Sequence, residues 1–209
     1  MTDSKRVPAA VRVLAAAAAG ASVAGAAAVA RQRRAERCRT AGDPVLRDDF
    51  PDAVSVGASL RRAGLTIALA ESCTGGLLGA ALTAVAGSSV YVRGGILAYA
   101  DDVKTSLLGV PAELIEVHGA VSEPVADAMA LGARRRLDAD LGVGVTGVAG
   151  PGSDSAAKPA GLIFVAVAGP QDAIRRIRLD RDRGREANRA TAVRAALRLC
   201  AEAATDTDR

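Results

Sequence analysis

The 209-residue sequence is poor in the residue types that bind metals or stack on nucleic-acid bases. It has a single histidine, His118, no tryptophan, two phenylalanines and two tyrosines. Without a histidine cluster we expect no metal site and a mechanism that needs no cofactor. The net charge of +4 would suit nucleic acid, but the basic residues are dispersed and few aromatic side chains could stack, so we expect no nucleic-acid partner.

Cysteine is also scarce. Cys38, Cys73 and Cys200 are odd in number, widely spaced and without a CxxC pair, which argues against a disulfide framework or a structural zinc site. A reducing compartment fits this pattern best, and we expect a cytoplasmic protein.

Lysine is rare although the chain is basic. Of its 27 lysine and arginine residues, only Lys5, Lys104 and Lys158 are lysine. Arginine keeps its proton in proteins whereas lysine can lose it, so a position that needs a base accepts lysine alone. Lys104 and Lys158 lie beside segments that carry other candidate site residues. Plain surface charge is the alternative interpretation.

Residues 1–50 differ in composition from the rest of the chain. An uncharged, alanine-rich run from Val13 to Ala30 is flanked by basic residues on both sides. Its length would permit a membrane span, but it has few strongly apolar side chains, so insertion would be marginal. We interpret residues 1–50 as a helical or disordered extension. In a membrane-tethered alternative, the arginines after residue 30 would hold the main domain on the cytoplasmic side.

Apolar runs alternate with amphipathic stretches over residues 51–204, which predicts an α/β domain. The predicted elements are helices at 52–63 and 75–85, strands at 65–70 and 94–100, short helices across 101–117, a helix from Ser122, strands at 141–148, 162–168 and 173–179, and a last helix with Cys200 on its apolar face. We expect one three-layer α/β/α domain whose sheet is mostly parallel but mixed, because the last two strands can pair as a hairpin. Residues 205–209 are expected to form a disordered tail.

The first predicted strand runs directly into the segment Glu71-Ser72-Cys73-Thr74-Gly75-Gly76 and then into a helix. In open α/β sheets, ligands bind beyond the carboxyl ends of strands, so Ser72 and Thr74 would lie at such a site. Gly75 and Gly76 would let the backbone approach a phosphate or an oxyanion. Helix capping by the hydroxyl residues is the alternative interpretation.

Four segments should gather at one edge of this sheet: residues 71–76, 99–104, 146–152 with 158–161, and 181–189. Ser72 is a candidate nucleophile, but a serine needs a neighbouring base. Lys104 could be that base if its surroundings favour the neutral amine, and the hydroxyl of Tyr99 could assist acyl transfer. Cys73 is the competing nucleophile. We favour serine, because a turn at Ser72 would point Cys73 elsewhere as a small buried side chain.

Other motifs exclude common enzyme classes. Residues 142–147 match G-x-G-x-x-G but lie inside a predicted strand, so they do not indicate a dinucleotide site. The chain has no P-loop signature and no G-x-S-x-G elbow, which disfavours P-loop NTPases and α/β-hydrolases. His118 precedes a predicted helix cap, and we expect it to be structural.

Several segments together carry a family resemblance: residues 70–76, 87–89, 93–95, 108–110, 118–124, 147–152 and 158–159. In collinear order over residues 52–203 they resemble the CinA C-terminal domain, the nicotinamide-nucleotide amidase family. The resemblance implies an amidohydrolase of pyridine-nucleotide recycling and NAD metabolism. It would convert nicotinamide mononucleotide, a small-molecule nucleotide, to nicotinate mononucleotide and ammonia. We also expect a homodimer.

The resemblance assigns Ser72 as nucleophile and Lys104 as base, with Tyr99 nearby. The substrate-binding residues that it implies are Glu71, Thr74, Gly75, Gly76, Thr146, Gly147, Gly150, Pro151, Gly152, Arg183 and Arg185. The arginines would hold the phosphate, and the sequence does not decide between Arg183 and Arg185.

The chain departs from the family beside the candidate base. Where the family usually reads Tyr-Ser-Asn-Glu-x-Lys, this sequence reads Tyr99-Ala100-Asp101-Asp102-Val103-Lys104, which changes the surroundings of the lysine. An alternative function is therefore a nucleotide-binding regulatory module of the competence or damage-inducible type. Nucleotide binding without ammonia release would distinguish it from an amidase.

Overall fold

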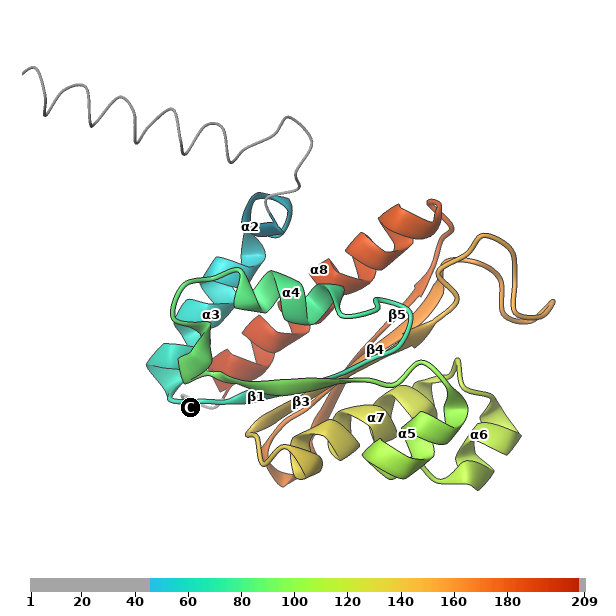
Figure 1. Cartoon of the computed structure of the whole chain (residues 1–209), viewed down its shortest axis with the longest axis horizontal. Coiled ribbons are helices and arrows are strands. Elements are labelled where there is room, and N and C mark those ends of the chain that lie inside the picture. The colour runs from blue at the N-terminus through green and yellow to red at the C-terminus, as the bar shows by residue number, and fades with distance from the viewer. Residues whose placement is uncertain (1–45, 207–209) are drawn as a thin grey trace, which may run out of the picture. The chain divides into compact units, whose positions relative to one another are not determined.

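A mixed five-stranded sheet forms the centre of the protein in a computed structural model that describes residues 46–206 (Figure 1). The strands, in their order across the sheet, are β2 (Val92–Leu97), β1 (Ile67–Glu71), β3 (Leu141–Gly147), β4 (Leu162–Ala168) and β5 (Ile174–Asp180). Strands β2, β1 and β3 are parallel, and β4 is antiparallel to both β3 and β5. Only β4 therefore runs against the common direction, and the expected hairpin of the last two strands is confirmed.

Helices cover both faces of the sheet, which confirms the three layers. Figure 1 shows one face covered by α3 (Asp52–Ala63), α4 (Leu77–Thr83) and α8 (Arg185–Asp206), and the other by α5 (Asp101–Leu108), α6 (Ala112–His118) and α7 (Glu123–Arg136). The short elements are α2 (Leu46–Asp49), η1 (Ser88–Val90) and η2 (Pro170–Asp172). Among residues 46–206, no helix is both long and apolar enough to span a membrane. The alanine-rich run at 13–30, Lys5 and Cys38 lie outside the described residues.

The central strands read as continuous apolar runs because helices bury both of their faces. Every residue of β1 is buried, whereas the edge strands β2 and β5 alternate between partly buried and exposed positions. The largest core cluster joins the sheet to α3, α4 and α8, and Cys200 is fully buried in it, as predicted.

The glycines of the G-x-G-x-x-G pattern serve helix packing. A Cβ at Gly142 would lie 2.1 Å from the carbonyl oxygen of Ala130, and one at Gly144 would lie 2.2 Å from that of Ala126. Both carbonyls belong to α7, so these glycines allow its backbone to lie directly against β3. This packing accounts for the motif without a dinucleotide.

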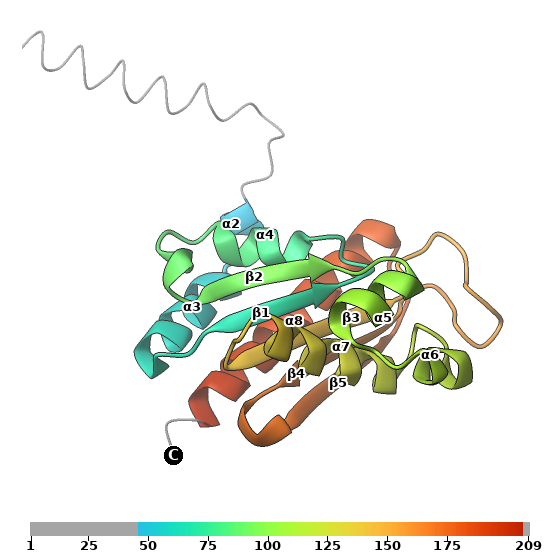
Figure 2. The same ribbon diagram turned by 60° about the horizontal axis from the view of Figure 1, so that its bottom comes forward.

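The predicted boundaries differ from the observed ones mainly near the site. The strand predicted at 94–100 is β2 at Val92–Leu97, because the chain leaves the sheet before Tyr99 and enters α5 at Asp101. The helix predicted at 75–85 is the shorter α4. Figure 2 shows that the carboxyl ends of β1 and β3, the start of α5, the loop between β3 and β4 and the start of α8 gather at one end of the sheet.

Candidate active site

A cleft with two adjoining lobes lies at this end of the sheet. The serine lobe, about 230 Å³, is lined by Ser72, Cys73, Tyr99, Asp101, Lys104, Ala120, Val121, Thr146, Gly147, Ala149 and Asp154. The arginine lobe, about 260 Å³, is lined by Tyr99, Val121, Gly147, Val148, Ala149, Gly150, Pro151, Gly152, Ser153, Asp154 and Arg185. Five residues belong to both lists, so the lobes form one continuous cleft. The structure therefore brings all four predicted segments together.

Ser72 is held at the end of the β-ladder. Its N–H donates to the carbonyl oxygen of Val145 on β3 at 3.0 Å, and its own carbonyl accepts the N–H of Gly75 at 3.0 Å. The second bond closes a tight turn that Gly75 and Gly76 continue with φ values of +62° and +89°, in the region that favours glycine. Within residues 46–206 the Oγ of Ser72 has no hydrogen-bond partner, so it is available to a ligand in the serine lobe.

Lys104 is a buried cation on α5, with 2% of its surface exposed. Its Nζ donates to the carbonyl oxygen of Tyr99 at 3.0 Å and to the carboxylate of Asp101 at 2.9 Å. An ammonium has three N–H donors, so one is left without an acceptor among the described residues. Aspartate at residue 101, the departure from the family pattern, thus places a carboxylate within hydrogen-bond distance of the candidate base.

Tyr99 takes part through its backbone as well as its side chain. The bond to Lys104 comes from the carbonyl oxygen, not from the phenol, and 60% of the residue is exposed. Tyr99 lines both lobes. Assistance by its hydroxyl stays a prediction.

Cys73 is buried, and burial raises its pKa to about 12. At neutral pH the side chain is therefore a thiol, which is a poor nucleophile compared with a thiolate. It packs in the core, as expected of a small buried side chain, but it also contributes to the wall of the serine lobe. The expectation that it points entirely elsewhere is corrected to that extent.

Glu71 binds the start of α4 rather than the cleft. Its two carboxylate oxygens accept the N–H groups of Gly76, Leu78 and Gly79 at 3.0, 3.1 and 2.8 Å. These are the N–H groups that a helix leaves unpaired in its first turn, and a carboxylate there also suits the helix dipole. The backbone donors of Gly76 are thus unavailable to a ligand.

The prediction that residues 71 and 74–76 contact substrate is therefore not supported by their placement. Glu71, Thr74, Gly75 and Gly76 line neither lobe. Thr74 is fully buried, its hydroxyl has no partner in the described residues, and its carbonyl oxygen accepts an N–H of Arg189 at 2.8 Å. These four residues shape the turn that presents Ser72.

Thr146 and the loop after β3 also line the cleft. The hydroxyl of Thr146 donates to the carbonyl oxygen of Ala120 at 2.8 Å, which ties the end of β3 to the segment before α7. Gly150 and Gly152 have φ values of +92° and +83°, so the loop follows a path that other residues would rarely adopt. Thr146 and the predicted residues 147 and 150–152 all line the cleft.

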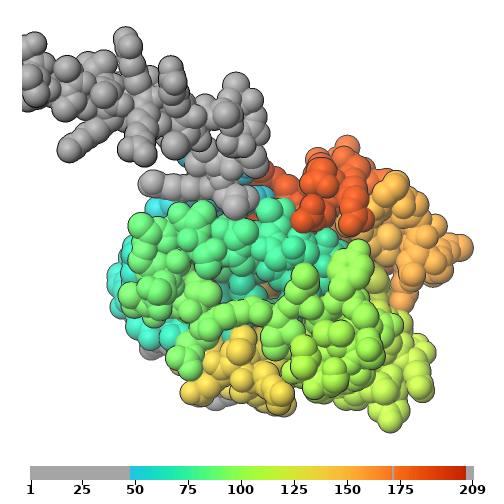
Figure 3. Space-filling view, in the orientation of Figure 1, coloured from blue at the N-terminus to red at the C-terminus, as the bar shows by residue number. Residues whose placement is uncertain are grey.

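The structure separates the two candidate arginines. Arg185 lines the arginine lobe and donates to the carbonyl oxygen of Gly150 at 2.6 Å. Arg183 lines neither lobe, and its backbone N–H donates to the side-chain oxygen of Asn188 at 2.8 Å. Arg185 is thus the arginine in position to meet a ligand. Figure 3 shows the start of α8, in red, adjoining the orange loop between β3 and β4.

Asn188 is a residue that the sequence did not indicate. It is 2% exposed, and its amide donates to the carbonyl oxygen of Ala149 at 3.0 Å and to the carboxylate of Asp182 at 2.8 Å. Together with the bond from Arg183, these contacts fasten the wall of the arginine lobe to the turn before α8. An asparagine in the first turns of an amphipathic helix looks like an ordinary surface residue, so only the tertiary contacts identify it.

Lys158 supports the neighbouring loop. Its Nζ donates to the carbonyl oxygen of His118 at 3.0 Å, and it lines neither lobe. His118 contributes this carbonyl rather than its imidazole, in agreement with the structural role expected for it. In the described residues, no group of three or more His, Cys, Asp and Glu side chains could hold a metal ion.

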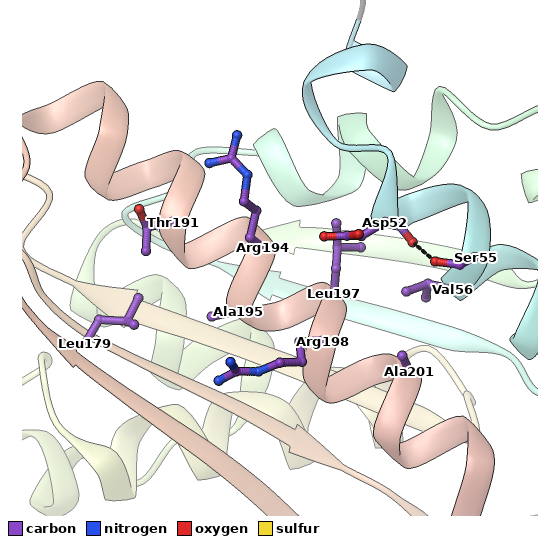
Figure 4. Close-up of a pocket in the computed structure, with 10 residues that line it drawn as sticks. All are labelled: Asp52, Ser55, Val56, Leu179, Thr191, Arg194, Ala195, Leu197, Arg198 and Ala201. Atoms are coloured by element: carbon purple, nitrogen blue, oxygen red, sulfur yellow. Dashed lines mark hydrogen bonds between the residues drawn. The ribbon is translucent and has the colours of Figure 1, made fainter.

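A larger cavity of about 520 Å³ lies apart from the cleft, between α3, α8 and β5. Figure 4 shows Asp52 and Ser55 on α3 beside α8, with the side chains of Arg194 and Arg198 on α8 directed away from them. The hydroxyls that line this cavity donate to backbone carbonyl oxygens, that of Ser55 to Asp52 at 2.8 Å and that of Thr191 to Ala187 at 2.6 Å, and not to a side-chain base. The chemistry-bearing residues are therefore those of the cleft.

Known proteins resemble this chain in sequence and in fold. The family model of the CinA C-terminal domain matches residues 51–204. The chain belongs to the CinA C-terminal domain family. The resemblance recognised in the sequence is thereby confirmed.

The CinA domain has similar curated relatives. A CinA-like protein of Gloeobacter violaceus is 52% identical over 153 residues, which are 73% of this chain and 36% of the relative. A CinA-like protein of Mycolicibacterium gilvum is 62% identical over 106 residues, 51% of this chain and 25% of the relative. The match thus spans about a third or less of the length of these relatives.

Solved structures confirm the fold. The competence/damage-inducible protein CihA of Agrobacterium tumefaciens aligns with a TM-score of 0.72 and 38% identity, over 78% of this chain and 96% of that protein. A CinA superfamily protein of Klebsiella pneumoniae aligns with a TM-score of 0.70 and 33% identity, over 76% and 98%. The CinA domain is therefore similar over nearly the full length of those chains.

Proposed function

We propose that the CinA domain hydrolyses the carboxamide of nicotinamide mononucleotide to give nicotinate mononucleotide and ammonia. The observation that carries this proposal is the presence of Ser72 and Lys104 in the wall of one small lobe. The serine Oγ has no partner there, and the buried lysine keeps one N–H position open. A hydroxyl and a buried amine are the two groups that acyl transfer needs when no histidine is available.

In the proposed reaction, the Oγ of Ser72 attacks the carboxamide carbon while the neutral amine of Lys104 accepts the hydroxyl proton. The lysine then returns this proton to the leaving nitrogen, and ammonia departs from an ester between substrate and serine. Water attacks that ester with Lys104 again accepting a proton. Lys104 returns this proton to the Oγ of Ser72 as the ester bond breaks, and nicotinate is released as its carboxylate after losing its acid proton to water.

One backbone group is suited to stabilise the oxyanion of each tetrahedral intermediate. Cys73 follows the nucleophile directly and lines the serine lobe, and among the described residues its N–H donates to no other residue. A fixed N–H donor beside a nucleophile stabilises the developing charge without reorganisation. It takes the place of the donors of Gly75 and Gly76, which the turn and Glu71 occupy.

The arginine lobe suits the nucleotide phosphate. Arg185 has further N–H donors besides the one bound to Gly150, and it is the first residue of α8. A phosphate near this residue would meet both a guanidinium and the positive end of a 22-residue helix. The ring carboxamide would then extend into the serine lobe.

A second candidate function is nucleotide binding without turnover. The ion pair between Lys104 and Asp101 favours it, because a lysine held as an ammonium cannot accept the serine proton. In that case the cleft would bind nicotinamide mononucleotide and release no ammonia.

The test is ammonia release from nicotinamide mononucleotide by wild type, Ser72→Ala, Cys73→Ala and Lys104→Arg. Loss of the nucleophile is expected to lower kcat by about 10⁴-fold or more. Lys104→Arg should be similarly inactive because arginine cannot give up its proton, whereas Cys73→Ala should retain activity. Full activity in Ser72→Ala would exclude the serine mechanism, and binding without ammonia from wild type would establish the alternative.

A further inference from the structure

The two lobes of the cleft differ in charge. The charged side chains of the serine lobe are Asp101, Lys104 and Asp154, whereas the arginine lobe shares Asp154 and adds Arg185. Asp101 and Lys104 are paired at 2.9 Å and offset each other. The carboxylate of Asp154 has no hydrogen-bond or ion-pair partner among residues 46–206. The serine lobe is therefore negative whether Lys104 is neutral or protonated.

Asp154 is also held in place by its backbone. Its N–H donates to the carbonyl oxygen of Lys158 at 3.0 Å, and the N–H of Lys158 donates to that of Ser155 at 3.0 Å. The Nζ of Lys158 in turn binds the carbonyl oxygen of His118 at 3.0 Å. The small turn at residues 154–158 is thus anchored to the segment before α7, which keeps Asp154 at the boundary of the two lobes.

We propose that Asp154 is a specificity-determining residue that selects ligands with a positively charged ring. This inference rests on the proposed function. The pyridinium of nicotinamide mononucleotide is a cation and its phosphate is an anion. The substrate therefore matches a cleft with a carboxylate where the lobes meet and a guanidinium in the arginine lobe. The product carries a new carboxylate in the serine lobe, so the same charge pattern favours substrate over product.

The decisive comparison uses two ligands that differ in ring charge. Nicotinamide mononucleotide and its reduced 1,4-dihydro form share ribose, phosphate and carboxamide, but the reduced ring is neutral. Binding is measured by titration calorimetry in a Ser72→Ala background, where neither ligand is consumed. Asp154→Asn should weaken binding of the oxidised form about fivefold, the scale of a partly exposed charge pair, and that of the reduced form less than twofold.

Asp138→Asn is the matched control. Asp138 is exposed in the turn before β3, at the other end of that strand, and its φ of +49° also suits asparagine. This variant should leave binding of both ligands unchanged.

Equal weakening of both ligands by Asp154→Asn, or no change for the oxidised form, would overturn the inference. Failure of the proposed function has a different signature, namely no ammonia from the wild-type protein while the charge preference in binding persists. If the Ser72→Ala protein binds neither ligand, both proposals fall.

Discussion

The Nζ of Lys104 lies 2.9 Å from the carboxylate of Asp101, three residues earlier on α5. Asp101 stands where the family usually has asparagine, so the candidate base has an ionic partner that the common pattern lacks. Because 56% of the Asp101 side chain is exposed, water screens the pair. We therefore expect Asp101 to slow the proposed reaction rather than to abolish it.

Asp101→Asn should accordingly raise the rate of ammonia release at pH 7. Removing the carboxylate takes away the ionic partner that competes with the proposed reaction for the Nζ of Lys104, and an exposed pair of this kind corresponds to about a two- to fivefold change. Initial rates at saturating nicotinamide mononucleotide measure the effect. Asp102→Asn, an exposed neighbour that lines neither lobe, is the control. A lower rate in Asp101→Asn would mean that the carboxylate positions Lys104 productively.

Much of the cleft could be predicted because strand ends converge. Ser72 directly follows β1, and Thr146 lies at the end of the parallel neighbour β3. Lys104 lies about one turn into α5, the helix that follows β2. The order of elements alone therefore places their backbones at one edge. Periodicity also identified β4 correctly at residues 162–168.

Side-chain direction within the turns could not be predicted. Glu71 looks like a ligand-facing acid in the sequence, but three N–H groups of α4 bind its carboxylate. Arg183 and Arg185 are two residues apart, so which one faces the loop depends on where α8 begins. That start is held by Asn188, whose bond to Ala149 joins residues 39 positions apart. Local sequence patterns carry no signal for such contacts.

Glu71→Ala should lower the free energy of unfolding by about 2 to 4 kcal/mol. It removes three hydrogen bonds to a carboxylate and leaves buried N–H donors of α4 unpaired. Urea denaturation followed by circular dichroism measures the loss. Glu71→Gln should cost less, since its amide oxygen can still accept. A variant as stable as wild type would show that α4 does not depend on this carboxylate.

Stability should also fall at high pH through the buried thiol of Cys200. Burial raises its pKa to about 12 from the usual 9.0, so above pH 9 the unfolded chain loses a proton that the folded chain retains. The stabilisation is complete below pH 9 and decreases by about 1.4 kcal/mol for each pH unit up to about pH 12. Urea denaturation of wild type and Cys200→Ala at pH 8 and pH 10 separates this contribution.

In that comparison Cys200→Ala should be less stable at pH 8, because it leaves a cavity in the core. Its further loss between pH 8 and pH 10 should be smaller than that of wild type by about 1.4 kcal/mol. Cys73→Ala is expected to behave in the same way, since the pKa of Cys73 is also raised to about 12. If the free energy of unfolding changed equally between pH 8 and pH 10 in wild type and both variants, the raised pKa values of the two thiols would be contradicted.

Asn188→Ala should impair binding more than chemistry. The substitution removes the bonds to Ala149 and Asp182 and the acceptor for Arg183, so the wall of the arginine lobe is released from the turn before α8. The serine lobe keeps Ser72 and Lys104, which Asn188 does not touch. We expect KM for nicotinamide mononucleotide to rise about tenfold, with kcat within about threefold of wild type.

Steady-state ammonia assays on folded protein, checked by circular dichroism, measure both constants. Thr191→Ala is a suitable control on the same helix, because its hydroxyl bonds only to the carbonyl oxygen of Ala187 and it lines the separate cavity of Figure 4. A fall in kcat with unchanged KM would instead place Asn188 in the support of the reacting groups. In that case the loop that Asn188 fastens would not contribute to phosphate binding. The reason for assigning phosphate binding to Arg185, which contacts the same loop, would then be lost.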